Sequence, residues 1–149
     1  MKEDTSFTFK LTNINFDSLD KSILDSMFKD GRIFSHLSER WLEDNCPMLK
    51  HISGCKDHDF VNKTDDTKYD AKTWTSRKLD FRPSNMLGKG RTFDKEIFDE
   101  KCNKLTYIVV SNIDFPEIKV RFIKGSDLVQ LYPKGYISTN KNELDKFFI

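Results

Sequence analysis

The segment that decides the fold is Asp59-Phe-Val-Asn-Lys-Thr-Asp-Asp-Thr-Lys-Tyr-Asp-Ala-Lys72. Aromatic and β-branched residues around positions 58–62 and 68–75 are typical of strands, and the polar segment between them is rich in turn formers. The pattern therefore predicts a β-hairpin. Side chains two residues apart leave the same face of a strand, so we expect Asp70 and Lys72 to project together, with Asp59 folded back beside them.

Two helices are predicted before this hairpin. Asp17 can cap the first, in which apolar residues recur at helical spacing until Asp30-Gly31. The second carries Ile33 to Leu42 at the same period and ends at Cys46-Pro47, because the residue before a proline avoids the helical region. A strand with alternating apolar residues is predicted before both, over positions 7–11.

Helices and strands are also predicted after the hairpin. Thr92 or Asp94 can cap a helix that ends near Asn103, and a nearly continuous apolar run from Leu105 to Val110 is typical of a buried strand. The remaining expected elements are a strand over 118–122, a short helix over 125–131 and a terminal helix over 142–148. The sequence thus predicts an α/β domain with a mixed central sheet flanked by helices.

Length and composition restrict the class of protein. The 149 residues fit one domain over 1–149, and 13 phenylalanines among 37% hydrophobic residues supply a packed interior. No segment approaches the apolar length of a membrane span, no secretory signal is visible at the start, and the three cysteines lack metal-binding or disulfide spacing. A cytoplasmic protein without a membrane association is therefore expected. The net charge of +1 excludes a protein that coats nucleic acid by bulk charge alone.

The acids and the lysine of the hairpin have a defined chemistry. Paired carboxylates such as Asp59 and Asp70 suit Mg²⁺, which prefers oxygen ligands and keeps several waters. A lysine beside such an ion, here Lys72, can orient an attacking water and stabilise the negative charge that develops on a phosphate. On its own, however, Asp-x-Lys is also typical of a surface ion pair.

This arrangement resembles the PD-(D/E)XK, or restriction-endonuclease-like, superfamily of nucleases. The resemblance covers roughly Gly31 to Val110 and includes the order helix, catalytic hairpin, helix and buried strand in a mixed sheet. It implies that Asp59 is the metal-bridging first acid, Asp70 the second acid and Lys72 the catalytic lysine, with the Ala71 carbonyl facing the metal. His58 stands where the family usually has proline, and aspartate at position 70 is less common there than glutamate.

The resemblance also implies a reaction and its partners. We expect Mg²⁺-dependent hydrolysis of phosphodiester bonds in DNA, with Mn²⁺ as a substitute, by a restriction-type endonuclease that acts as a homodimer. Glu39 is the choice for an additional acid that members often contribute from the preceding helix. A basic loop is expected to contact DNA through Arg77, Lys78, Arg82, Ser84, Asn85, Lys89 and Arg91.

Several alternatives remain at this point. Asp65 and Asp66 could replace Asp59 as first acid, although aspartates are expected in a turn for local hydrogen bonding. Glu39 and Glu43 could be solvated charges of a helix surface, and Trp74 is expected in the core. The alternative functions are a structure-selective nuclease, such as a Holliday-junction resolvase or a phage recombination nuclease, and a non-catalytic module that binds nucleic acid or a protein partner.

Overall fold

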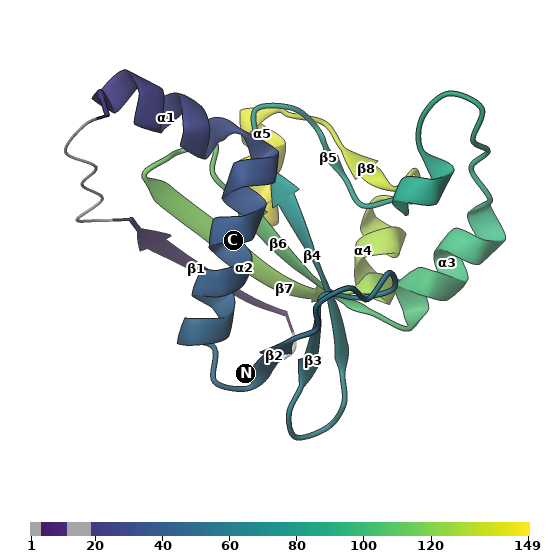
Figure 1. The fold of residues 1–149 in the computed structure, drawn as a ribbon. Coiled ribbons are helices and arrows are strands. Elements are labelled where there is room, and N and C mark those ends of the chain that lie inside the picture. The colour runs from purple at the N-terminus through teal and green to yellow at the C-terminus, as the bar shows by residue number, and fades with distance from the viewer. Residues whose placement is uncertain (1–3, 12–18) are drawn as a thin grey trace.

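The protein is an α/β protein with a mixed, strongly curled six-stranded sheet and, within the described residues, five helices (Figure 1). The computed structural model describes residues 4–11 and 19–149. The elements are β1 (Thr5–Lys10), α1 (Lys21–Lys29), α2 (Gly31–Asn45), β2 (Leu49–His51), β3 (Phe60–Asn62), β4 (Lys68–Trp74), β5 (Leu79–Asp80), a 3₁₀ turn η1 (Ser84–Met86), α3 (Lys95–Asn103), β6 (Thr106–Ser111), β7 (Glu117–Lys124), α4 (Gly125–Leu131), β8 (Tyr136–Ile137) and α5 (Lys141–Phe147).

Strand β4 is the junction of the sheet, whose strand order is β1-β7-β6-β4-β3-β2. It pairs antiparallel with β3 on one edge and parallel with β6 on the other, while β7 pairs antiparallel with β6 and β1. A parallel pair needs a crossover connection, and helix α3 lies in the segment that joins β4 to β6. Strands β5 and β8 form a separate two-stranded sheet.

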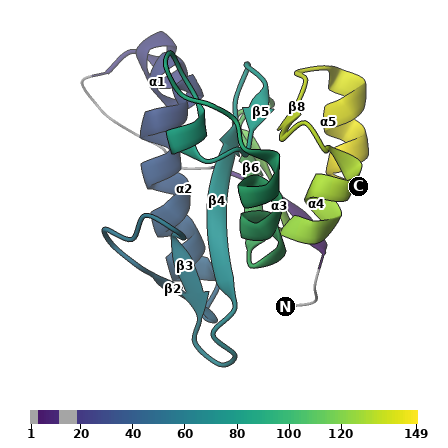
Figure 2. The same cartoon turned by 90° about the vertical axis from the view of Figure 1, so that its right-hand side faces the viewer.

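The two faces of the sheet carry two hydrophobic cores. On one face, Phe34 and Leu42 of α2 pack among Phe60, Ile108 and other residues of the strands. On the opposite face, side chains of α3, α4 and α5 pack against β4, β6 and β7, and the members with almost no exposed surface include Trp74, Phe98, Tyr107, Leu128 and Phe147. Figure 2 shows β4 between α2 on one side and α3 on the other.

The helix boundaries follow from local hydrogen bonds. The Asp30 side chain accepts from the backbone N–H groups of Arg32 and Ile33 and so caps α2, which ends at Asn45 as the Cys46-Pro47 pair predicts. Helix α1 begins at Lys21, and the predicted cap Asp17 lies outside the described residues. For α3 the structure selects Asp94 over Thr92, because the Asp94 carboxylate accepts from the Ile97 N–H at 3.0 Å.

The predicted hairpin is confirmed as β3 and β4, and the strands near 105–110 and 118–122 are confirmed as β6 and β7. The strand expected over 7–11 is present as β1, which pairs with β7. Strands β2, β5 and β8 were not predicted; they have two or three residues each. Among the described residues, no helix is long and apolar enough to cross a membrane.

Candidate active site at the β3–β4 hairpin

Asp59 is fixed at the point where β3 and β4 separate. The ladder between these strands ends at the pair Phe60 and Tyr69, and one residue further the Asp59 N–H donates to the Tyr69 carbonyl at 2.8 Å. The Asp59 carboxylate then accepts the N–H of Ala71 through Oδ2, also at 2.8 Å. A side chain thus replaces the backbone acceptor of a continuing strand, and the first acid lies next to Asp70 and Lys72.

Asp70 and Lys72 project from β4 on one face, as the spacing predicts. The Lys72 Nζ lies 2.9 Å from Asp70 Oδ2, with 11% of the Asp70 side chain and 26% of the Lys72 side chain exposed. Their neighbours in the parallel register on β6 are Tyr107 and Val109, which belong to the core beneath α3. The pair therefore lies over the hydrophobic core beneath α3, with a small part of each side chain exposed to solvent.

The surroundings of Asp59 disfavour the negative charge of its carboxylate. Burial raises the pKa of the Asp59 carboxyl, and the charge of Asp70 raises it further. The hydrogen bond from Ala71 and the positive charge of Lys72 oppose this rise without cancelling it. Carboxylates crowded in this way repel each other, and a bound cation would relieve the repulsion.

Glu39 of α2 belongs to the same cluster. Its Oε2 lies 3.3 Å from Nε2 of His51, and both side chains are largely buried. Burial raises the pKa of Glu39, as does the nearby charge of Asp59, against the opposing effect of His51. Glu43, one turn further along the helix, instead accepts the backbone N–H of His51 at 3.2 Å and lies 3.4 Å from Arg40.

His51 is the site residue that sequence reasoning missed. It ends β2, pairs with Phe60 of β3, and packs its imidazole edge-on against the Phe60 ring at 5.3 Å between centroids. The three histidines of the sequence lack the spacing of zinc ligands, so their pattern does not mark any of them as a site residue. A strand of three residues has no usable periodicity, so the sequence contains no signal that places His51 next to Glu39.

Side chains alone supply only some of the oxygen ligands that a hard cation such as Mg²⁺ needs at this site. Among the described residues, no group of three or more histidine, cysteine, aspartate or glutamate side chains is arranged to hold a metal ion. Mg²⁺ does not require one, because it is commonly bound through one or two carboxylates with waters and substrate phosphates. The N–H and C=O of one residue leave a strand on the same edge, so the Ala71 carbonyl faces the edge at which Asp59 lies.

The aspartates of the hairpin turn have local roles. Asp65 Oδ1 accepts the N–H of Thr67 at 2.9 Å, and Asp66 adopts a left-handed backbone conformation with φ of 59°. These are the features of turn residues, as predicted. Trp74 has no exposed surface and packs against Phe147, which confirms its expected core role.

The basic loop is partly occupied by contacts within the chain. Arg82 binds Asp80 with two hydrogen bonds, Nε to Oδ1 at 2.9 Å and Nη2 to Oδ2 at 2.5 Å, and Lys78 lies 3.4 Å from the same carboxylate. Arg91 donates to the carbonyls of Ser84 and Leu87. The side chains of Arg77, Ser84, Asn85 and Lys89 are exposed. Several of the basic side chains that were expected to contact DNA therefore bind groups within the loop itself.

Comparison with models of protein families, with curated proteins and with solved structures finds no match to this chain.

Proposed function

We propose that this protein is a metal-dependent DNA endonuclease of the PD-(D/E)XK type. The observation that carries the proposal is the hydrogen bond from the Ala71 N–H to Asp59 Oδ2, because it fixes the first acid beside the second acid and the lysine. A surface ion pair of the Asp-x-Lys type does not by itself require a second, partly buried acid beside it.

The order of elements around the site supports the same assignment. Helix α2, the β3–β4 hairpin, helix α3 and the buried parallel strand β6 follow one another as the resemblance implies. The helices flank β4 on its two sides (Figure 2). Glu39 extends the acidic cluster from α2, which is where the family often contributes another acid.

Each side chain has a distinct part in the proposed reaction. Asp59 and Asp70, with the Ala71 carbonyl, would hold Mg²⁺ or Mn²⁺, which when bound supplies a Lewis acid for the scissile phosphate. Lys72 holds the attacking water in line with phosphorus and stabilises the charge that builds on the phosphate oxygens. Glu39, whose Oε2 lies 3.3 Å from His51 Nε2, would hydrogen-bond a water at the same site.

The decisive experiment is plasmid cleavage. Purified protein should nick or linearise plasmid DNA in Mg²⁺ or Mn²⁺ and leave it intact in EDTA. Asp70→Asn and Lys72→Ala should each reduce the cleavage rate by at least about 10²-fold, the scale on which positioned acids and bases contribute. Circular dichroism should show that both variants remain folded.

Matched variants separate loss of the site from loss of charge. Asp66→Asn removes a carboxylate from the same hairpin, and asparagine tolerates the left-handed conformation found there. Lys141→Ala removes an exposed ammonium from the start of α5. Both controls should cleave like the wild type. Cleavage that persists in Asp70→Asn would refute the proposed site.

The products then distinguish the alternatives. Defined ends would indicate a restriction-type enzyme that reads bases, and cleavage confined to branched DNA would indicate a junction resolvase. Cutting both strands of a duplex requires two active sites, which is why we propose a homodimer. DNA binding without cleavage in any metal would identify a non-catalytic module, in which the Asp70–Lys72 ion pair serves the fold alone.

A further inference from the structure

The contacts of the basic loop raise the question of where a DNA backbone is held. Arg82, Lys78 and Arg91 are engaged with Asp80, Ser84 and Leu87. Phosphate binding needs concentrated cations whose charge is not already neutralised. Lysines that line a hollow near the candidate active site provide cations of this kind.

One hollow lies between the β3–β4 hairpin and helix α3. It is lined by Asp57, His58, Lys68, Ile97, Glu100, Lys101, Lys104 and Leu105. His58 is the residue before Asp59 in the chain, so this side of the hollow lies near the candidate active site. Ile97 has 55% of its surface exposed there, which leaves an apolar contact on the wall formed by α3.

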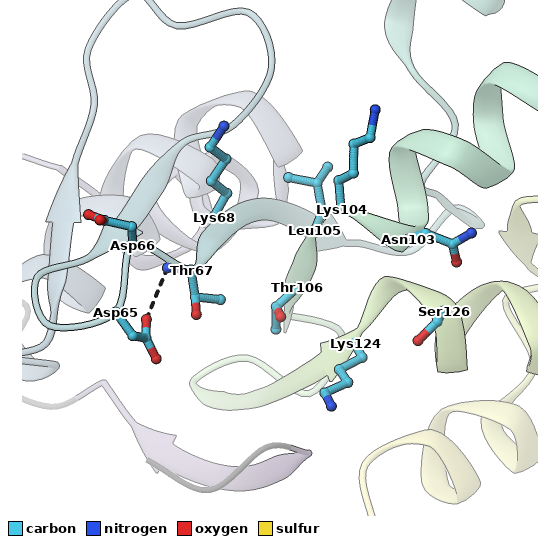
Figure 3. A pocket seen from close by; sticks show the side chains of 10 residues that line it. All are labelled: Asp65, Asp66, Thr67, Lys68, Asn103, Lys104, Leu105, Thr106, Lys124 and Ser126. Carbon is cyan, nitrogen blue, oxygen red and sulfur yellow. Dashed lines mark hydrogen bonds between the residues drawn. The ribbon is translucent and has the colours of Figure 1, made fainter.

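A second hollow continues from the first and shares Lys68, Lys104 and Leu105 with it. Figure 3 shows Lys68 and Lys104 extending in the same direction from β4 and α3, whereas Lys124 lies on the other side of the hollow. The hydroxyl-bearing residues Thr106 and Ser126 also line this hollow, as do Asp65 and Asp66 of the hairpin turn (Figure 3). The two hollows form one surface that leads from His58 toward the start of α4.

The lysines of this surface are available to a ligand. Lys104 lies 3.0 Å from Glu100, but about 70% of each side chain is exposed, and exposed pairs of this kind contribute little free energy. Lys68 and Lys101 take part in none of the ion pairs found among residues 4–11 and 19–149. An incoming phosphate can therefore bind Lys68 and Lys101 directly, and at Lys104 it competes only with the exposed pair to Glu100.

The geometry of β4 places Lys68 on the same side of the strand as the candidate site residues Asp70 and Lys72. Lys68, Asp70 and Lys72 are separated by two residues each on β4, so their side chains leave the same face of the strand. That face is the one covered by α3, which has Lys101 in its last turn and Lys104 at its C-cap. Lys68 lies about 6.6 Å along the strand from Asp70, as two residues at ~3.3 Å require.

We propose that Lys68, Lys101 and Lys104 form a track for the backbone of a DNA strand, next to the phosphate that is cut. The inference rests on the proposed function for its substrate class. With the scissile phosphate at Asp70 and Lys72, a neighbouring phosphate lies at Lys68, and the following one at Lys101 and Lys104. The track contacts the phosphates of the DNA backbone and does not distinguish one base sequence from another.

The test is DNA binding measured by fluorescence anisotropy in EDTA, with a short fluorescein-labelled duplex of mixed sequence. The triple variant Lys68→Gln/Lys101→Gln/Lys104→Gln should bind roughly ten-fold more weakly at low salt. The slope of log K against log salt concentration should become shallower by about two, since the track holds two phosphates and each contact contributes about 0.9.

The control removes charge from the opposite end of β4. Lys141 and Lys146 lie on α5, which packs against Trp74, whereas Lys68 begins the strand. Lys141→Gln/Lys146→Gln should bind DNA like the wild type. Equal affinities and salt slopes for the triple variant and this control would overturn the track. A binding difference without Mg²⁺-dependent cleavage by the wild type would overturn the proposed function and leave the track supported.

Discussion

Asp59 is held where its charged form is unfavourable in the free protein. Burial is the largest cause of the rise in its pKa, and Asp70 adds to it. When the folded pKa of an acid lies above its unfolded value, the native state binds more protons over the interval between them. The free energy of unfolding then falls as pH rises through that interval.

The first prediction follows for Asp59→Asn. The amide oxygen can still accept the Ala71 N–H, and the unfavourable charge is gone. We expect the variant to have a higher Tm than the wild type at neutral pH, with a difference that shrinks as pH falls below the raised pKa of Asp59. Thermal unfolding monitored by circular dichroism across this pH range measures the difference.

Asp65→Asn is the matched control. Hydrogen bonds from Thr67 lower the pKa of Asp65, so its charge is not unfavourable in the folded state. This variant should show no increase in Tm at neutral pH. A lower Tm for Asp59→Asn than for the wild type at neutral pH would contradict our account of the site's electrostatics.

The second prediction concerns the pair of Glu39 and His51. Both side chains are mostly buried, and Oε2 of Glu39 lies 3.3 Å from Nε2 of His51, so the two residues should be energetically coupled. A double-mutant cycle with Glu39→Gln and His51→Phe should give a coupling free energy of about 0.5–1 kcal/mol in urea unfolding. The phenyl ring preserves the edge-on packing against Phe60.

His36 provides the reference for this cycle. It is an exposed histidine of the same helix that affects Glu39 only through its charge. The cycle of Glu39→Gln with His36→Phe should therefore give a coupling free energy near zero. Similar coupling in the two cycles would mean that His51 does not support Glu39 specifically.

At the scale of elements, α3 connects the fold with the proposed DNA track. Asp94 caps the helix by accepting the Ile97 N–H, and Phe98 and Cys102 bury one side of it. The third prediction is that Asp94→Ala lowers the free energy of unfolding by about 1 kcal/mol, because a helix N–H loses its acceptor. Asp94→Asn keeps an acceptor and should cost much less; equal losses would exclude the cap as the cause. Urea titration measures both.

The elements that could be predicted from the sequence are those with local signals. The hairpin has strand-forming ends and a polar turn, and α2 and α3 have capping aspartates and helical periodicity. Strand β2 has three residues, too few for an alternating pattern. Its pairing with β3 depends on a loop that returns the chain, which no short segment encodes.

The candidate site was predictable to the same extent. Asp70 and Lys72 share a face by strand periodicity alone, and Asp59 reaches them because the hairpin is local. The contact of His51 with Glu39 joins β2 to α2 and requires the packed fold. All the cations of the basic loop are predicted from the sequence to be available to DNA, because the sequence does not show that the Arg82 side chain binds Asp80.

At the scale of the whole molecule, a cation at the site should stabilise the fold. A ligand that binds only the native state adds about 2.7 kcal/mol at a concentration of one hundred times its Kd. The fourth prediction is a rise in Tm of several degrees in Mg²⁺ or Mn²⁺ at that excess, measured by scanning calorimetry. K⁺ at equal ionic strength is the control. Asp59→Asn and Asp70→Asn should remove the rise, and a rise that survives both would place the ion elsewhere.

The position of β4 between an antiparallel and a parallel neighbour has a consequence for how the protein folds. The β3–β4 hairpin closes over a short turn, whereas pairing of β4 with β6 requires the whole connection through α3 to close first. Contacts between distant segments form late because closing a long loop costs more entropy. During synthesis, the acids and the lysine therefore reach their final surroundings only after β6 has emerged and docked, so a partly made chain carries the residues of the site without their final arrangement.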